Sequence, residues 1–208
     1  GTLDANNNQY NSDKYFRIYN NSDETLYADG LVLFESKFLN DTPQDYKPDM
    51  RDSALAVSVA YMVPGSGKDH PVEPGKSILL VDLGLDHTKT NPNSYDLSKA
   101  DFEWYDKTEN GGDTDTDVPN LIKLITMNGN RQLGVWTPHT RGVKTYAIGY
   151  LGDAQHAVNV ADYVKNYVYR YTYDFTDKGK TYPMKGDAYL LPNSWIADCV
   201  NMCPKEAP

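Results

Sequence analysis

Short runs of alternating hydrophobic and polar residues recur along this chain, and turn-forming residues separate them. Alternation with a period of two places successive side chains on opposite faces of an extended strand. The apolar run at residues 77–81 follows Pro74-Gly75 and is typical of a strand covered on both faces. The predicted strands are 15–19, 26–34, 54–63, 77–81, 102–105, 121–126, 146–151, 167–175 and 188–191.

Turn-separated strands of this length favour an all-β sandwich. The first two strands, divided by Asn20-Asn21-Ser22-Asp23, predict a hairpin at the start of the fold. A helix is predicted over residues 153–165, with Asp153 as its N-cap, and a helical turn over residues 194–200. We therefore expect a sandwich with one or two short helices.

The chain shows no internal repeat, linker or compositional break after its start. Residues 1–13 are polar and aperiodic, which predicts a disordered lead-in, and we interpret Gly1 as a cloning scar. We expect residues 14–203 to form a single domain and residues 204–208 to form a tail.

The formal net charge is −9, and the chain has no cluster of basic residues. Binding to a phosphate backbone requires such clusters, so we expect no nucleic-acid partner. No apolar stretch is long enough to span a membrane. The 17 tyrosines supply rings that bury apolar area and hydroxyls that seek polar partners, which suits sandwiches and binding surfaces.

Two segments carry a family resemblance. Residues 15–33, YFRIYNNSDETLYADGLVL, resemble the opening of the lamin-tail domain, and residues 72–81, VEPGKSILLV, resemble the turn before the central strand of that family. From residues 91–102 to residues 195–198 the chain is similar to surface proteins of Gram-negative gut bacteria that carry such a lamin-tail-like domain and have no assigned function. The resemblance implies an immunoglobulin-like sandwich in an exported lipoprotein at the cell surface or outer membrane. It supplies no catalytic residues.

Tyr167, Tyr169, Tyr171, Tyr173 and Phe175 occupy alternate positions of one predicted strand. Their rings therefore share one face, while polar side chains take the other. This face is either the core side of a sandwich strand or an exposed platform on which sugar rings stack.

A second candidate is the loop that contains Trp136, His139 and Arg141. Trp offers a flat apolar face, Arg donates a planar fork of hydrogen bonds, and loops on a rigid sandwich often bind ligands. These three residues are our predicted ligand-binding site. The alternative is that Trp136 is a buried core residue, because large aromatic side chains are mostly buried.

Asp113, Asp115 and Asp117 place carboxylates at alternate positions of a Gly- and Thr-rich loop. Such spacing suits a hard cation, so calcium is the candidate cofactor, with a solvated acidic loop as the alternative. The four histidines show no metal-ligand spacing, which gives zinc little support. The spacing of Cys199 and Cys203 favours two thiols over a disulfide bond between them, since that bond would close a very short loop.

These observations favour a non-catalytic module for surface binding or adhesion, whose ligand is a glycan or a surface protein. One alternative is a glycoside hydrolase that uses paired carboxylates, which would have to face each other across a cleft. Another is a structural spacer between domains of a longer chain.

Overall fold

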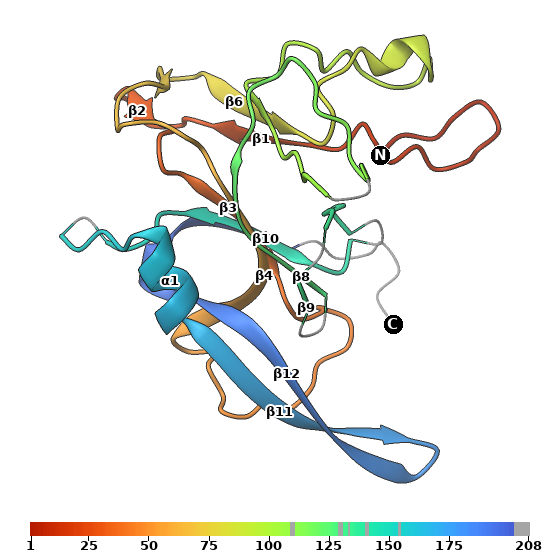
Figure 1. The fold of residues 1–208 in the computed structure, drawn as a ribbon, viewed down its shortest axis with the longest axis vertical. Helices are drawn as coiled ribbons and strands as arrows, with labels where there is room; N and C mark the ends of the chain where they lie inside the picture. Colours follow the sequence, from red (N-terminus) through yellow and green to blue (C-terminus); the bar gives the residue numbers. More distant parts are fainter. Residues whose placement is uncertain (109–110, 129–130, 133, 140–141, 154, 202–208) are drawn as a thin grey trace. The chain divides into compact units, whose positions relative to one another are not determined.

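The computed structural model describes residues 1–108, 111–128, 131–132, 134–139, 142–153 and 155–201 (Figure 1). Contacts within the chain define two compact units. Unit 1 comprises Gly1–Leu31, Tyr61–Lys123 and Gly134–Thr140, and unit 2 comprises Val32–Ala60, Leu124–Leu133 and Arg141–Pro208. Two of the boundaries between the units fall within strands, one in β4 and one in β8, and the single domain expected from the sequence stays a prediction.

Unit 1 is built on a three-stranded sheet in the order β1-β6-β7. Its strands are β1 (Tyr15–Tyr19), β6 (Ser77–Val81) and β7 (Phe102–Glu103), and a smaller sheet pairs β2 (Leu26–Tyr27) with β5 (Pro71–Val72). Strand β1 is antiparallel to β6, whereas β7 is parallel to β6. Because β1 alternates strictly, Tyr15, Arg17 and Tyr19 are exposed, whereas Phe16 and Ile18 turn partly inward. A 3-10 turn, η1, spans His87–Lys89.

Most of the second sheet belongs to unit 2, and its strand order is β11-β12-β4-β3-β10-β13. Strand β8 also pairs with β4, and β9 pairs with β8. The bounds are β3 (Val32–Ser36), β4 (Ala54–Met62), β8 (Ile122–Asn128), β9 (Arg131–Gln132), β10 (Thr145–Gly149), β11 (Val168–Asp177), β12 (Lys180–Pro192) and β13 (Ile196–Asn201). Helix α1 (Val160–Asn166) and the 3-10 turn η2 (Asn193–Trp195) complete the unit.

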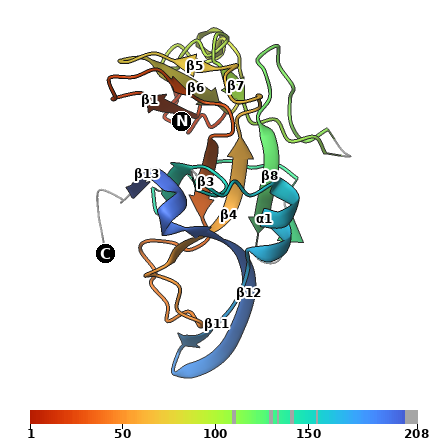
Figure 2. The same ribbon diagram turned by 90° about the vertical axis from the view of Figure 1, so that its left-hand side faces the viewer.

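The predicted all-β class is confirmed, because α1 is the single α-helix among the described residues. No helix in the described part of the chain has the length and apolar character needed to cross a membrane. Figure 2 shows unit 2 from the side, with the β11–β12 hairpin extending from the rest of its sheet.

The predicted strand at residues 26–34 is two strands of different sheets. Gly30 lies in the turn between β2 and β3 and adopts a φ of 75°, which L side chains rarely adopt. The Asp29 carboxylate accepts the N–H groups of Gly67, Asp69 and His70 at 2.9–3.1 Å and so fixes this turn. The hairpin predicted at the start is therefore wrong: β1 pairs with β6 and β2 pairs with β5.

The predicted helix at residues 153–165 is correct only in its second half. Asp153 accepts the N–H groups of Gln155 and His156 in a tight turn, and the N-cap of α1 is Asn159, whose side chain accepts from Asp162 N–H. Residues 194–200 end η2 and then form β13 instead of a helical turn, because β10 offers a free edge for pairing.

Residues 1–13, expected to be disordered, make specific hydrogen bonds. Leu3 and Gln9 form an isolated bridge, and Tyr10 O–H bonds His87 Nδ1 at 2.9 Å. Asp13 is 2% exposed and accepts from Thr2 N–H and Ser94 O–H. The polar side chains that suggested disorder here satisfy one another and the loop at residues 91–94.

Candidate functional site

The β11–β12 hairpin in unit 2 has two chemically different faces. Residues opposite each other in an antiparallel pair share a face, and the register pairs Tyr171 with Gly186, Tyr173 with Met184 and Phe175 with Tyr182. One face is therefore aromatic and apolar along most of the hairpin. The other carries the charged and hydroxyl side chains, including Arg170 opposite Asp187.

The inner part of the aromatic face is covered by the segment that follows β3, residues 37–53 (orange in Figure 1). Its backbone is fixed to β11 by two hydrogen bonds between Lys47 and Thr172, of 2.8 and 2.9 Å. Tyr169 O–H donates to the Pro48 carbonyl at 2.6 Å. This segment is therefore held at a defined distance from the hairpin.

Two aromatic side chains of this segment pack against the hairpin tyrosines. The Phe38 and Tyr46 rings are stacked with centroids 3.6 Å apart. Tyr171 meets both rings edge-on, at 4.9 Å from Phe38 and 5.4 Å from Tyr46. Edge-to-face and stacked pairs each add stability beyond the area that they bury. The inner tyrosines are therefore core residues, as the first interpretation of the Tyr series proposed.

A cavity of about 420 Å³ opens beside this cluster. Its apolar lining consists of Phe38, Leu39, Pro43, Tyr46, Met50, Ala54, Leu55, Ala56, Tyr169 and Ile196. Its polar lining consists of Ser36, Asn40, Gln44, Asp49, Arg51, Thr145, Asn193 and Cys199. A mainly apolar concavity with a few polar groups is the usual form of a small-molecule site.

The cavity carries little net charge. Asp49 and Arg51 are its charged lining residues, and they form an ion pair with each other. Hydrogen bonds from Arg51 hold the pKa of the Asp49 carboxyl down at about 2. The side-chain amides of Gln44 and Asn193 make no hydrogen bond with another described residue, so they can serve a ligand.

Of the predicted ligand-binding residues, Trp136 and His139 belong to unit 1, and Trp136 is 2% exposed. Its ring packs against Trp104 at 4.9 Å, Tyr61 at 5.3 Å and Phe16 at 6.2 Å. Trp136 is thus the buried core residue that the sequence left as an alternative, and its ring faces contact protein. His139 is half-buried, and Arg141 lies outside the described residues.

The backbone at Trp136 is fixed by a buried carboxylate. Asp106 is fully buried and accepts from Trp136 N–H at 2.6 Å and from Tyr61 O–H at 2.7 Å. Lys123 completes the group with an ion pair of 2.9 Å. Burial, reinforced by Asp106, raises the pKa of Tyr61, so this hydroxyl stays protonated and donates. The arrangement satisfies a buried charge and organises the core of unit 1.

The three aspartates of the predicted calcium site do not converge. Asp113 is half-buried and accepts from Asp106 N–H at 2.8 Å, whereas Asp115 and Asp117 are exposed. Among the described residues no group of three or more His, Cys, Asp or Glu side chains is placed to hold a metal ion. Calcium binding by this loop stays a prediction that requires the loop to rearrange.

If the loop binds calcium, excess Ca²⁺ added after EDTA should raise the melting temperature by about 2–4 °C, because a ligand that binds only the folded state stabilises it. Thermal unfolding measures this shift. Asp115→Asn combined with Asp117→Asn is the matched control and should abolish it. An unchanged melting temperature under both treatments contradicts calcium binding.

The sequence pointed to the hairpin tyrosines but not to the cavity. Phe38, Tyr46 and Met50 lie in a turn-rich stretch with no regular period, so they gave no strand or helix signal. The available signal was the presence of three large apolar residues in a polar segment. Cys199, which follows η2, lines the cavity and is exposed, whereas Cys203 lies outside the described residues.

Comparison with solved structures gives a crystal structure of a DUF4876 family protein from Bacteroides thetaiotaomicron VPI-5482. The TM-score is 0.69 at 19% sequence identity, which shows a shared fold. The match covers 97% of this chain and 50% of that protein, so the chain spans about half the length of its structural relative. No curated protein matches the chain.

The family model described as "Protein of unknown function (DUF4876)" matches residues 73–208, more than half of the chain. This range includes the α1 helix, the complete β11–β12 hairpin and β13. The cavity segment at residues 37–53 lies before it, within the part that the structural match covers. The chain therefore belongs to the DUF4876 family of proteins of unknown function.

Proposed function

We propose that the chain is a non-catalytic binding module of an exported surface protein, and that its ligand is a saccharide held in the cavity of unit 2. The observation that carries this proposal is the chemistry of the cavity lining. Aromatic rings of Phe38, Tyr46 and Tyr169 lie beside the uncharged amides of Gln44 and Asn193. A sugar ring presents an apolar face to aromatic rings and hydroxyls to amide groups, so this combination suits it.

The charge of the lining favours a neutral ligand. Asp49 and Arg51 compensate each other, and neither has an unmatched charge to offer to an anion or a cation. This pair is solvent-exposed, and a charged ligand would have to compete with it for either side chain. A neutral saccharide needs no charged partner in the cavity.

Binding without hydrolysis is the better-supported form of this function. Glycoside hydrolysis uses two carboxyl groups that face each other about 5–9.5 Å apart. Among the described residues that line the cavity, Asp49 is the one carboxylate, and it forms an ion pair with Arg51. The hydrolase alternative would need a second carboxylate in the same cavity.

The cell-surface location is supported by two resemblances: that of residues 15–33 and 72–81 to the lamin-tail domain, and that of residues 91–198 to gut bacterial surface proteins. An exported, lipid-anchored protein would present the cavity to glycans outside the cell. The proposal also assigns the fold to the immunoglobulin-like, lamin-tail-like class. A neighbouring surface protein is the second candidate ligand.

Tyr46→Ala should weaken saccharide binding at least about tenfold, because it removes a cavity ring that stacks on Phe38 and contacts Tyr171. A glycan array followed by titration calorimetry measures the loss. Tyr19→Ala, which removes an exposed tyrosine of unit 1, is the matched control and should bind as the unaltered protein does.

Tyr46→Ala also removes a packing contact of the segment at residues 37–53. Two further measurements therefore distinguish a lost ligand contact from a disturbed segment. Asn193→Ala removes a lining amide without touching the aromatic cluster and should also weaken binding. In a Cys203→Ser background, a bound saccharide should slow maleimide labelling of Cys199, which lines the cavity. Binding that none of these changes affects would place the ligand elsewhere.

A further inference from the structure

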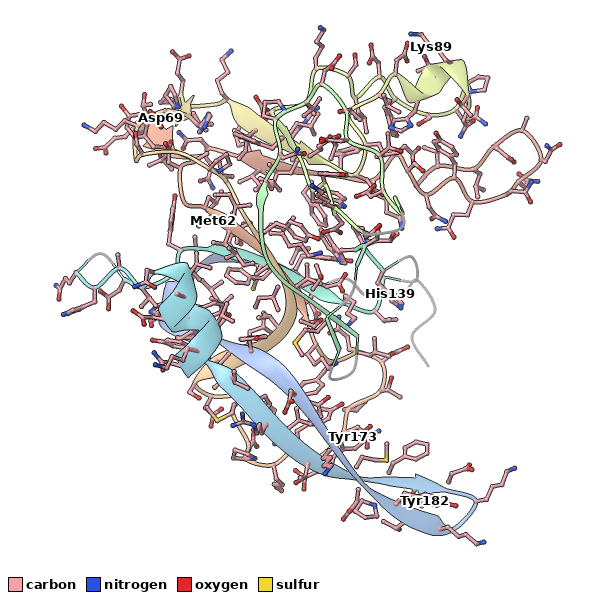
Figure 3. All side chains as sticks on the ribbon, viewed as in Figure 1. Met62, Asp69, Lys89, His139, Tyr173 and Tyr182 are labelled. Atoms are coloured by element: carbon pink, nitrogen blue, oxygen red, sulfur yellow. The ribbon has the colours of Figure 1, made fainter. Side chains whose placement is uncertain are left out.

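The outer part of the hairpin carries aromatic side chains that lie beyond the cavity lining. Phe175, Tyr182 and Met184 are 44%, 46% and 40% exposed, and Tyr173 is half-buried. The register places all four on the aromatic face of the hairpin, and Figure 3 shows Tyr173 and Tyr182 along its outer portion. We call these four residues the outer aromatic face.

The outer aromatic face continues the rings of the cavity. Tyr169 lines the cavity, and Tyr171 and Tyr173 follow it on the same side of β11. The Tyr173 ring lies 5.1 Å from that of Tyr46, another lining residue. Rings therefore recur at alternate positions of β11, about 6.8 Å apart along the strand, from Tyr169 beside the cavity to Phe175.

The outer aromatic face is narrow for a protein partner. Side chains of this size have about 200 Å² each, so four that are less than half exposed offer roughly 300–400 Å², against about 800 Å² per partner in a stable interface. Its four side chains are uncharged, and beyond them the same face ends in the oppositely charged residues Asp177 and Lys180, which face each other in the register. A thin, neutral ligand fits this surface better than a second copy of the chain.

We propose that the ligand is a linear neutral glycan, one end of which occupies the cavity while the following sugar units lie along the outer aromatic face. This inference rests on the proposed function of the cavity and extends it from a single sugar to a chain. The binding energy then divides between the two regions, and affinity depends on ligand length.

The test uses linear oligosaccharides of two to six sugar units from the cello-, malto-, xylo- and manno-series. We expect affinity to rise about tenfold or more from two to six units in the series that binds. In the variant Phe175→Ser with Tyr182→Ser, affinity for the six-unit chain should fall to that for the two-unit chain, with the latter unchanged. Calorimetry measures both affinities.

Thr176→Ala with Thr181→Ala, which alters the opposite hairpin face, is the matched control and should retain the dependence on length. If short chains bind as tightly as long ones, the glycan does not extend along the outer aromatic face, and the proposed saccharide binding in the cavity still stands. Loss of all saccharide binding across the series and the array overturns both. A dimer in sedimentation that the Phe175→Ser and Tyr182→Ser changes dissociate would assign the outer aromatic face to a second copy instead.

Discussion

Asp106→Ala should destabilise the protein by about 3–5 kcal/mol, the largest effect that we expect from a single substitution. The carboxylate is fully buried, so its removal leaves three groups without the partner that they have in the folded protein. Tyr61 O–H and Trp136 N–H lose their acceptor, and Lys123 loses its ion-pair partner. An unsatisfied buried donor costs about 1–3 kcal/mol, which explains why the loss exceeds that of a surface ion pair.

Urea unfolding followed by tryptophan fluorescence measures this effect, because the carboxylate accepts from Trp136 N–H and the Trp136 ring packs against Trp104. Asp106→Asn keeps the shape and one acceptor oxygen and should give an intermediate loss. Asp45→Ala removes an exposed partner of Lys47 and should change stability by less than about 1 kcal/mol. Equal stability of Asp106→Ala and Asp45→Ala would show that the buried network contributes nothing.

Strand positions were predictable from the sequence, and strand partners were not. Strict alternation or a continuous apolar run located β1 and β6 at their observed bounds. Their pairing places Tyr15 opposite Val81, far away in the sequence. A local hydrophobic pattern carries no information about which distant strand a strand pairs with. The hairpin predicted at the start failed for this reason, since Asp29 and Gly30 turn the chain away before it can return along β1.

The candidate site was predictable on one side only. The period of two over residues 167–175 predicted a single aromatic face. Tyr167 is instead the C-cap of α1, and along β11 this face is buried at Tyr171 and exposed at Phe175. Which end is covered depends on the aperiodic segment that carries Phe38 and Tyr46. The burial of Trp136 also depends on a contact that is distant in the sequence. Its position in a loop suggested exposure, whereas Asp106 accepts from its backbone N–H and holds the ring in the core.

A carboxyl group in unit 1 should make stability depend on pH. Burial and the nearby Asp113 raise the pKa of Asp82 to about 7, while Lys14 and Trp104 oppose this rise and Asp106 adds to it. In the unfolded chain an Asp has a pKa near 3.9, so the folded state binds this proton more tightly. Stability from the protonated form is complete below the unfolded pKa and is lost as the pH rises through about 7.

Between pH 5 and pH 8 the loss should amount to about 2–3 kcal/mol, since each unit of pKa difference is worth about 1.4 kcal/mol. Asp82→Asn mimics the neutral carboxyl, so the variant should be more stable than the unaltered protein at pH 8 and show a smaller dependence on pH. Urea unfolding at several pH values measures both. Asp117→Asn, at an exposed position, is the control and should leave the slope unchanged. A variant that keeps the full slope would mean that Asp82 is ionised in the folded protein throughout this range.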